Sequence, residues 1–216
     1  GRFRSVPMQE LLNEAKRLAS EGVKELVLVA QETTLYGKDL TGEKQLPLLL
    51  HELCKIEGIE WIRLLYCYPE EITDELIKVI KTEEKVCNYI DMPIQHSENR
   101  ILQRMGRRTS REDLVAVIKK LRKEIPDITI RTTLITGFPG ESQEDHEGLM
   151  NFVEECQFDR LGVFTYSPEE DTLAATFEDQ IDEEVKEERR DELMSLQQEI
   201  SYEHTQQLVG KTIKVM

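Results

Sequence analysis

The sequence has few of the features that place a protein in a membrane or outside the cell. It contains no run of about eighteen apolar residues that would cross a bilayer, and its first residues lack the apolar core of a secretion signal. Its four cysteines, Cys54, Cys67, Cys87 and Cys156, lie far apart and match no metal or cluster spacing. We therefore expect a cytoplasmic protein whose cysteines are small buried hydrophobic residues in a reducing compartment.

Positive charge is outnumbered, because 28 Lys and Arg residues stand against 43 Asp and Glu residues, which gives the 216 residues a formal net charge of −15. The segment from Glu169 to Glu203 holds 14 acidic and 3 basic residues, a local charge of −11, so that the rest of the chain carries only −4. Such a segment repels nucleic-acid backbones and attracts a basic protein. A solvated helix face without a partner is the alternative that the sequence leaves open.

Helical and strand patterns alternate over the first 168 residues, a length sufficient for one large domain with its own core. The predicted helices are 5–20, 46–56, 74–81, 110–123 and 144–156, and the predicted strands are 26–30, 61–66, 89–94, 128–136 and 161–165. The continuous apolar run 26–30 is typical of a strand buried on both faces. Strands joined by helices predict a parallel α/β sheet, either doubly wound or barrel-like, and the pattern alone does not choose between them.

The pattern changes after Pro168. Residues 172–177 are irregular, and 183–208 has the pattern of one long acidic helix. The few apolar residues of this helix predict that it packs along the outside; they are Val185, Leu193, Leu196 and Ile200. Residues 210–216 are typical of the start of a strand, and both ends of the sequence suggest a piece of a longer chain.

The segment from Ile130 to Ser142 is the most informative part of the chain. An alternating apolar strand ends in the turn Gly137–Gly140, and Ser142 with Asp145 forms a helix-start signal. The backbone is therefore bare of side chains where a strand passes to a helix, which is where parallel α/β enzymes bind ligands. A tight turn with no ligand is the alternative.

Polar and aromatic residues cluster at the predicted strand ends. Parallel strands end at the same edge, so these side chains would suit a ligand with a flat base, a ribose and an amino-acid head. Arg131 would pair with a ligand carboxylate or with an acid of a neighbouring strand. A histidine at a strand end, such as His96, is more often an ordinary hydrogen-bonded residue than a ligand contact. The candidate cofactor-binding residues are Gln31, Glu32, Tyr66, Gln95, His96, Arg131, Thr133, Gly137, Phe138, Glu141 and Tyr166.

Three further arginines, Arg104, Arg107 and Arg108, lie within five residues of one another. They would either contact phosphate or form a surface loop that offsets the acidic segment.

With these residues in view, the chain resembles the radical S-adenosylmethionine methylthiotransferases, and most closely the branch that modifies an aspartate of a small-subunit ribosomal protein. The turn Gly137–Glu141 is shared across that family, whereas the Gln-Glu-Thr-Thr block and 160–164 point to the ribosomal branch. The blocks that carry the resemblance are 1–5, 27–37, 93–96, 101–107, 137–141 and 158–167. Asp171 stands where the resemblance leads us to expect a glycine.

The resemblance implies a partial (β/α) TIM-like barrel of the radical SAM type, followed by a C-terminal acidic helix. S-adenosyl-L-methionine would lie across the strand ends with its adenine near Gly137, and Gln31, Gln95 and Arg131 would hold its ribose and amino-acid groups. The implied division is a barrel over 1–168, a helical extension over 169–209, and the start of a TRAM-like substrate-binding domain over 210–216.

The family binds one 4Fe-4S cluster through a CxxxCxxC loop and a second cluster in an N-terminal domain. None of the four cysteines here fits that loop, so the resemblance implies two clusters in a full-length parent, no metal or catalytic residue in this piece, and an inactive fragment. The first strand and the cluster loop of the barrel would lie upstream of Gly1.

The implied reaction is methylthiolation of the β-carbon of an aspartate, because an unactivated C–H bond needs radical chemistry that only a cofactor supplies. The implied partners are a basic small-subunit ribosomal protein and an electron donor, with no membrane, and with nucleic acid only through a C-terminal domain. The alternatives are a tRNA adenosine methylthiotransferase and a non-catalytic barrel that binds nucleotides or proteins.

Overall fold

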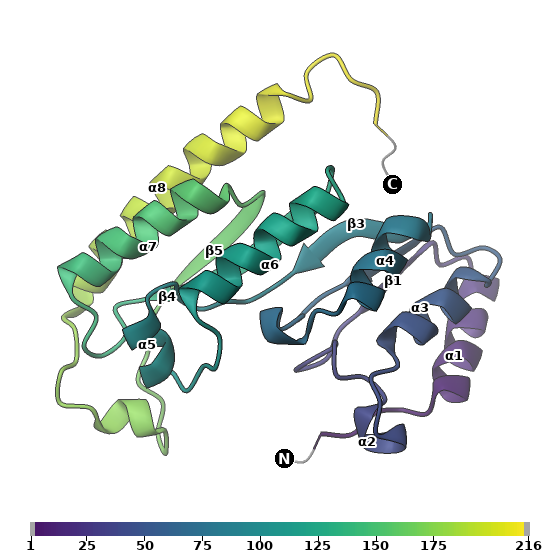
Figure 1. Cartoon of the computed structure of the whole chain (residues 1–216), viewed down its shortest axis with the longest axis horizontal. Coiled ribbons are helices and arrows are strands. Elements are labelled where there is room, and N and C mark those ends of the chain that lie inside the picture. The colour runs from purple at the N-terminus through teal and green to yellow at the C-terminus, as the bar shows by residue number, and fades with distance from the viewer. Residues whose placement is uncertain (1–2, 214–216) are drawn as a thin grey trace. The chain divides into compact units, whose positions relative to one another are not determined.

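Helices and strands alternate from α1 to β5, as the sequence pattern predicts (Figure 1). The structure is a computed structural model that describes residues 3–213. In chain order its elements are α1 (Met8–Ser20), β1 (Glu25–Leu28), α2 (Lys38–Thr41), α3 (Leu46–Cys54), β2 (Trp61–Leu64), η1 (Pro69–Glu71), α4 (Asp74–Thr82), β3 (Val86–Asp91), α5 (Asn99–Arg104), α6 (Arg111–Glu124), β4 (Thr129–Thr136), α7 (Gln143–Cys156), β5 (Arg160–Thr165), η2 (Leu173–Thr176) and α8 (Glu183–Gln206). Along the described residues, no helix is both long enough and apolar enough to cross a membrane.

The chain divides into two compact units. Unit 1 comprises Gly1–Pro93 and Val115–Thr129, and unit 2 comprises Ile94–Leu114 and Ile130–Met216. The predicted division into 1–168, 169–209 and 210–216 stays a prediction.

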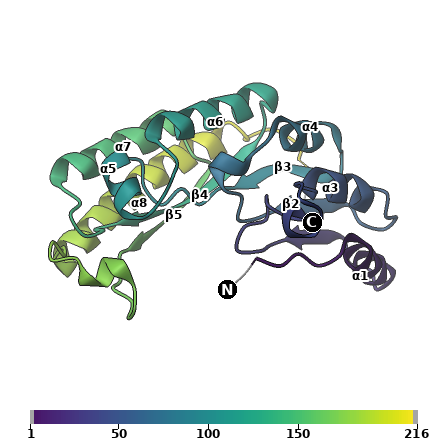
Figure 2. The same ribbon diagram turned by 60° about the horizontal axis from the view of Figure 1, so that its bottom comes forward.

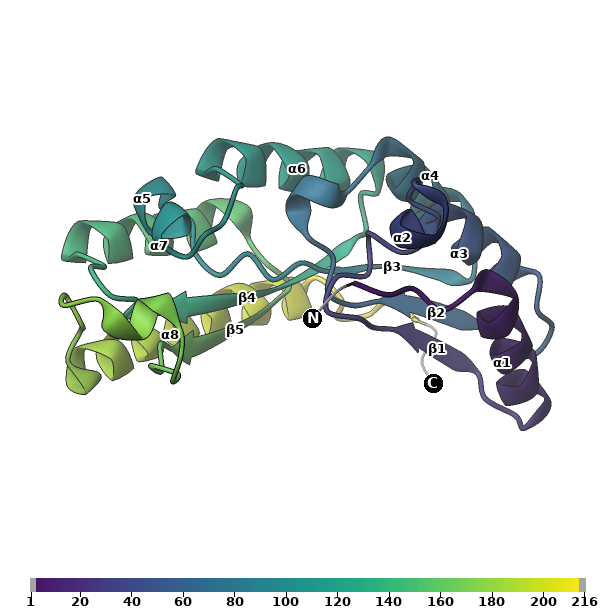
Figure 3. The ribbon, with the colours of Figure 1, turned by 90° about the horizontal axis from the view of Figure 1, so that it is seen from below.

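Unit 1 is built on parallel strands in the order β1-β2-β3. Helices α3 and α4 lie on one side of these strands (Figure 3). The buried face is apolar, because Leu50, Ile62, Leu64 and Ile90 are fully buried. Thr73 caps α4 as the sequence predicts, since its side chain accepts a hydrogen bond from the Leu76 amide.

The prediction that the strand over 26–30 is buried on both faces is wrong. Leu26 is buried, whereas Val27 is 48% exposed and Val29 is 62% exposed. Alternate side chains of a strand point to opposite faces, and in the described residues only one face of β1 is covered. A continuous apolar run therefore did not reveal how many faces are packed.

Unit 2 is built on β4 and β5, which pair in parallel from Arg131 opposite Arg160 to Thr136 opposite Thr165. Helices α7 and α8 run side by side (Figure 2). The predicted capping box at the start of α7 is present, because Ser142 accepts from the Asp145 amide and Asp145 accepts from the Ser142 amide.

The inner face of α8 is more polar than the sequence pattern predicts. Of the expected apolar positions, Leu193 and Ile200 are buried, but Val185 and Leu196 are only half-buried. The remaining buried positions of the helix are Lys186, Arg189 and Gln197. Gln197 donates to the Phe158 carbonyl at 2.8 Å, which accounts for one of these polar side chains.

The sequence pattern did not predict the short helices. Helix α5 occupies part of the arginine-rich stretch, and its last residue, Arg104, forms an ion pair with Asp179 at 2.7 Å and lies over the Phe177 ring. For Arg104 the structure therefore favours compensation of the acidic segment. The strand expected over 210–216 is not formed in residues 211–213, and residues 214–216 lie outside the described part of the chain.

The unexpected residue in the family pattern, Asp171, keeps the backbone geometry of a glycine. Its φ is 64°, in the left-handed region that aspartate tolerates better than most residues. Asp171 therefore adopts a backbone conformation that a glycine at this position would adopt without strain.

We expect Asp171→Gly to raise the free energy of unfolding by up to about 1 kcal/mol, because it relieves the left-handed strain. Asp171→Val should lower the unfolding free energy, since a β-branched residue is strained there. Urea unfolding of the three chains measures both effects, and equal stabilities of the Gly and Val variants would contradict this account.

Candidate functional site

The loop after β1 places a carboxylate in an apolar setting. Glu32 is buried, and one of its oxygens accepts from the Thr34 amide at 2.8 Å and from the Thr34 hydroxyl. Its Oε2 is buried and makes no hydrogen bond of normal geometry with residues 3–213. Burial raises the pKa of Glu32, although hydrogen bonds from Thr34 and a weaker one from the Tyr68 backbone oppose the shift. A cavity of about 320 Å³ in unit 1 is lined by Glu32 together with Val27, Val29 and Tyr36.

The end of β2 is tied to this loop and to the end of β3. Thr33 donates through its amide to the Tyr66 carbonyl at 3.0 Å and through its hydroxyl to the Leu65 carbonyl at 2.6 Å. Tyr66 in turn donates its amide to Asp91 Oδ2 at 3.1 Å. Asp91 is buried, so the ends of the three strands in unit 1 are linked by hydrogen bonds.

Two candidate residues hold strained backbone conformations directly after strands. Tyr66 has a φ of 57° and Gln95 has a φ of 71°, in the left-handed region that non-glycine residues rarely adopt. In unit 2, Gln95 is held by backbone bonds on both sides, since its amide donates to Thr133 O and its carbonyl accepts from the Ile135 amide. Strain of this kind costs about 1–3 kcal/mol and gathers at functional sites.

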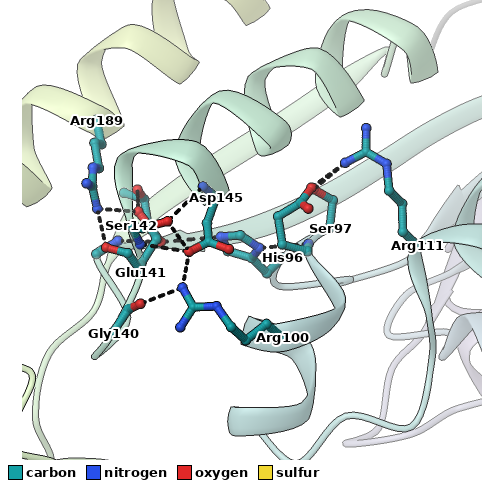
Figure 4. A network of polar contacts seen from close by, with 12 residues as sticks. His96, Ser97, Arg100, Arg111, Gly140, Glu141, Ser142, Asp145 and Arg189 are labelled. Carbon is teal, nitrogen blue, oxygen red and sulfur yellow. Dashed lines mark hydrogen bonds and ion pairs between the residues drawn. The ribbon is translucent and has the colours of Figure 1, made fainter.

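Glu141 is the centre of the polar network in unit 2 (Figure 4). Its carboxylate accepts from the Gly137 amide at 2.9 Å, from the Thr136 hydroxyl at 3.2 Å and from Arg189 Nη1 at 2.8 Å. His96 Nε2 lies 3.3 Å from Glu141 Oε2. All of these groups contact the Glu141 carboxylate, and Glu141 as a whole residue is only 2% exposed.

The same network assigns the tautomer of His96 and lowers the pKa of Glu141. The Glu98 amide donates to His96 Nδ1 at 3.0 Å, so that nitrogen is an acceptor and the ring proton lies on Nε2, facing Glu141. Burial alone would raise the pKa of Glu141, but the hydrogen bond from His96, the positive charge of Arg189 and the Gly137 amide together hold that pKa below its ordinary value.

A second set of arginine contacts surrounds the turn (Figure 4). Arg100, in α5, donates to the Gly140 carbonyl at 2.8 Å and pairs with Asp145 at the start of α7. Arg111, at the start of α6, bonds the Ser97 hydroxyl at 3.3 Å. The Arg100 contacts anchor the residues on either side of Glu141, and the Arg111 contact anchors the segment that follows His96.

The apolar part of the site is an aromatic cluster. The rings of Phe138 and Tyr166 meet edge to face with centroids 5.1 Å apart, and Phe138 also meets Phe177 at 6.3 Å. The Tyr166 hydroxyl is buried and has no hydrogen-bond partner within the described chain. The cluster therefore presents one unsatisfied polar atom inside an apolar wall.

The predicted site residues separate by unit. Unit 1 holds Gln31, which is exposed, with Glu32 and Tyr66. Unit 2 brings together His96, Gly137, Phe138, Glu141 and Tyr166, and it places Gln95 beside Thr133.

Arg131 is not gathered with the strand-end residues of unit 2. It lies near the start of β4, six residues before Gly137, which corresponds to about 20 Å along an extended strand. There it is exposed and lines a groove with Arg160 and Tyr202. Its role as a cofactor contact stays a prediction that this placement does not support.

Three buried charged residues at the strand ends were missed from the sequence: Asp91, Lys186 and Arg189. Asp91 interrupts the apolar run that ends β3. Lys186 and Arg189 are basic residues in an acidic helix, and they continue the 3-4-4-3 spacing of Leu193, Gln197 and Ile200. This helical spacing is the feature of the sequence that could have identified Lys186 and Arg189 as buried residues.

Comparison with known proteins gives one family and a set of relatives. The model of the radical SAM superfamily matches residues 1–153. Over all 216 residues the chain is 62% identical to the ribosomal protein uS12 methylthiotransferase RimO of Lachnoclostridium phytofermentans and 56% identical to that of Clostridium perfringens. The chain spans about half the length of these relatives, 49% and 48% respectively.

Solved structures share the fold at low identity. Coproporphyrinogen III oxidase HemN from Escherichia coli, described as a radical SAM enzyme, matches with a TM-score of 0.63 at 19% identity over 92% of this chain and 46% of its own. Methylornithine synthase PylB matches with a TM-score of 0.62 at 16% identity over 91% and 55%. These likenesses confirm the α/β class and the partial barrel of the radical SAM type.

We expect Glu141→Gln to lower the free energy of unfolding at pH 7 by about 3 kcal/mol, because it leaves Arg189 buried without its anion. A carboxyl group with a lowered folded-state pKa stabilises fully above its unfolded value of 4.5 and loses that effect as the pH falls through the folded pKa. The gap between wild type and variant, followed by urea unfolding, should therefore narrow in acid. A gap independent of pH would contradict the assignment.

Glu32→Gln should have the opposite sign. The raised pKa of Glu32 means that its charged form opposes folding above the folded-state pKa. The variant should therefore be as stable as the wild type or more stable at pH 7, with the difference vanishing in acid. A loss of stability at neutral pH would show that the Glu32 carboxylate has a partner that this network lacks.

Proposed function

Because the chain belongs to the radical SAM superfamily, we propose that it forms part of an enzyme that adds a methylthio group to the β-carbon of an aspartate in ribosomal protein uS12. The observation that carries this proposal is the 62% identity, over the whole chain, with a protein named as a uS12 methylthiotransferase. The two strained residues after strands, Tyr66 and Gln95, support a ligand site at the strand ends.

The residues present fit S-adenosylmethionine. Glu32 offers a buried carboxylate oxygen that makes no hydrogen bond of normal geometry with the described residues, which suits an ammonium or hydroxyl group. Tyr166 offers an unsatisfied hydroxyl. When bound, S-adenosylmethionine supplies the radical chemistry that breaks an unactivated C–H bond.

The residues present do not fit an iron–sulfur cluster. Residues 3–213 contain no group of three or more His, Cys, Asp or Glu placed to hold a metal. Cys67 and Cys156 are buried, and burial raises the pKa of Cys67, which disfavours the thiolate that a cluster requires. No step of the proposed reaction is therefore assigned to a cluster held by these residues.

The described residues support the reaction by holding and shielding groups. The cluster formed by Phe138, Tyr166 and Phe177 excludes water from its surroundings. Glu141 remains ionised beside Arg189 and keeps the Gly137 amide engaged, so the turn after β4 is fixed before any ligand arrives. His96 keeps its proton on Nε2 toward Glu141 and thereby joins the same fixed unit.

The acidic helix supports a basic protein partner. Lys186 and Arg189 are buried on the inner face of α8, and Arg190 donates to Asp191. The exposed face of α8 is therefore more acidic than the amino-acid composition of the whole helix suggests. A groove of about 980 Å³ runs between α7 and α8. Its acidic lining residues are Glu147, Glu188, Asp191, Glu192 and Glu199. Such a surface attracts a basic ribosomal protein and disfavours tRNA.

The proposed activity is tested in a chimera. The matching region of the Lachnoclostridium phytofermentans enzyme is replaced by these 216 residues, and the reduced protein is supplied with S-adenosylmethionine and either uS12 or tRNA. We expect mass spectrometry to show one methylthio group on an aspartate of uS12. Modification of tRNA alone would assign the chain to the other branch, and no product with an intact native control would favour a barrel that only binds.

Docking is tested by reversing charge on the outer face of α8. The triple variant Glu184→Lys, Glu187→Lys and Glu188→Lys should weaken uS12 binding at least tenfold at low salt, and the loss should shrink as salt screens the surface. The control variant Glu10→Lys, Glu57→Lys and Glu84→Lys makes the same change of net charge in unit 1. Equal losses in both variants, or none in the first, would leave α8 as a solvated helix.

A further inference from the structure

Two cations of the acidic helix are buried at the strand ends of unit 2. Lys186 is 2% exposed and Arg189 is 7% exposed, although lysine and arginine are rarely buried unless they are paired. Both lie on the inner face of α8, three residues apart. We propose that Lys186 and Arg189 are positioning residues that hold the segments after β4 and β5 in the shape that binds the cofactor. This inference rests on the proposed function.

Arg189 acts on the segment that follows β4. Its Nη1 donates to Glu141 Oε1 at 2.8 Å and to the Glu141 carbonyl at 3.1 Å, so one guanidinium fixes both the side chain and the backbone of this residue. The other carboxylate oxygen of Glu141 accepts the Gly137 amide. Arg189 therefore fixes the turn at Gly137, because the Glu141 carboxylate is bonded to both residues.

Lys186 acts on both segments. Its Nζ donates to the Tyr166 carbonyl at 3.1 Å, just after β5, and to Glu183 Oε1 at 2.6 Å. Its aliphatic stem covers Gly137 so closely that a β-carbon there would collide with Lys186 Cγ. The ammonium group also lies 5.5 Å from the centre of the Tyr166 ring, which meets Phe138 edge to face. Lys186 therefore seats the turn by packing and Tyr166 by a charged hydrogen bond.

The spacing of the two cations explains why one helix can serve two strands. The end of β5 is already joined to the end of β4, because the Tyr166 amide donates to the Thr136 carbonyl at 2.9 Å. Residues three apart lie on the same face of a helix, so the two side chains reach these two adjacent segments together. A rigid helix thus fixes both segments at once, which preorganises a site more precisely than loops alone.

The proposal differs from a purely structural role in what substitution should change. If Lys186 and Arg189 only attached α8, any substitution that loosened the helix would affect ligand binding in proportion to lost stability. If they position the turn, ligand binding falls beyond that proportion. Leu193 is the matched control, because it is fully buried on the same face of α8 and belongs to neither strand-end segment.

The experiment uses the full-length chimera and S-adenosylmethionine itself. Lys186→Met retains the stem over Gly137 and removes the ammonium group, and Arg189→Met removes the guanidinium. We expect calorimetry to show at least tenfold weaker binding for Arg189→Met and a smaller loss for Lys186→Met, with partial recovery in Arg189→Lys. Leu193→Ala should lower the melting temperature comparably and leave the Kd unchanged.

Amide hydrogen exchange gives a reading that needs no ligand. The Gly137 amide should exchange faster in Arg189→Met than in Leu193→Ala at matched stability, because only the first change releases Glu141. Equal exchange in the two variants, or weakening of binding by Leu193→Ala as large as by Arg189→Met, would overturn the positioning role. Failure of the unmodified chimera to bind S-adenosylmethionine would instead count against the proposed function, and the exchange comparison would still decide this one.

Discussion

The buried carboxylate of Glu141 is the constraint on which the arrangement of unit 2 depends. An ionised carboxyl group out of water must be paired and hydrogen-bonded, or it costs several kcal/mol. Glu141 meets this requirement with groups from separate parts of the chain. They are the Gly137 amide in the turn after β4, His96 in the segment between β3 and α5, and Arg189 in α8. Displacing any of these segments would remove a partner from the buried carboxylate, so Glu141 holds the three segments in place relative to one another.

Local sequence signals predicted the elements well where the signal was itself a physical interaction. The capping box at Ser142 and the cap at Thr73 are hydrogen bonds whose donors and acceptors can be identified in the sequence, and both are formed. The apolar run that became β1 failed as a predictor of burial, because hydrophobicity records no count of covered faces. The exposed Val27 shows that burial depends on which elements lie opposite, and that is not a local property.

The candidate site likewise contains residues that the sequence pattern suggested and residues that it did not. Residues placed directly after strands, such as Gln95 and Gly137, were predicted because parallel strands share one carboxyl edge. Arg131 was grouped with them by motif, but the length of β4 separates it from the turn. The supporting residues Lys186 and Arg189 escaped prediction because a cation in an acidic helix is usually a surface residue, and only burial reveals that these two face inward.

The two faces of α8 follow from one requirement. Replacing a buried ion pair by apolar residues is often neutral or stabilising, so stability alone does not explain a helix that buries lysine and arginine. Glu141 explains Arg189, because the Gly137 amide needs an acceptor and the resulting carboxylate needs a cation. Once Arg189 is taken up by Glu141 on the inner face, the acids on the outer face keep few counter-ions, of which one is Lys186 beside Glu183. The same pairing that fixes the turn therefore leaves the helix with an acidic surface for a basic partner.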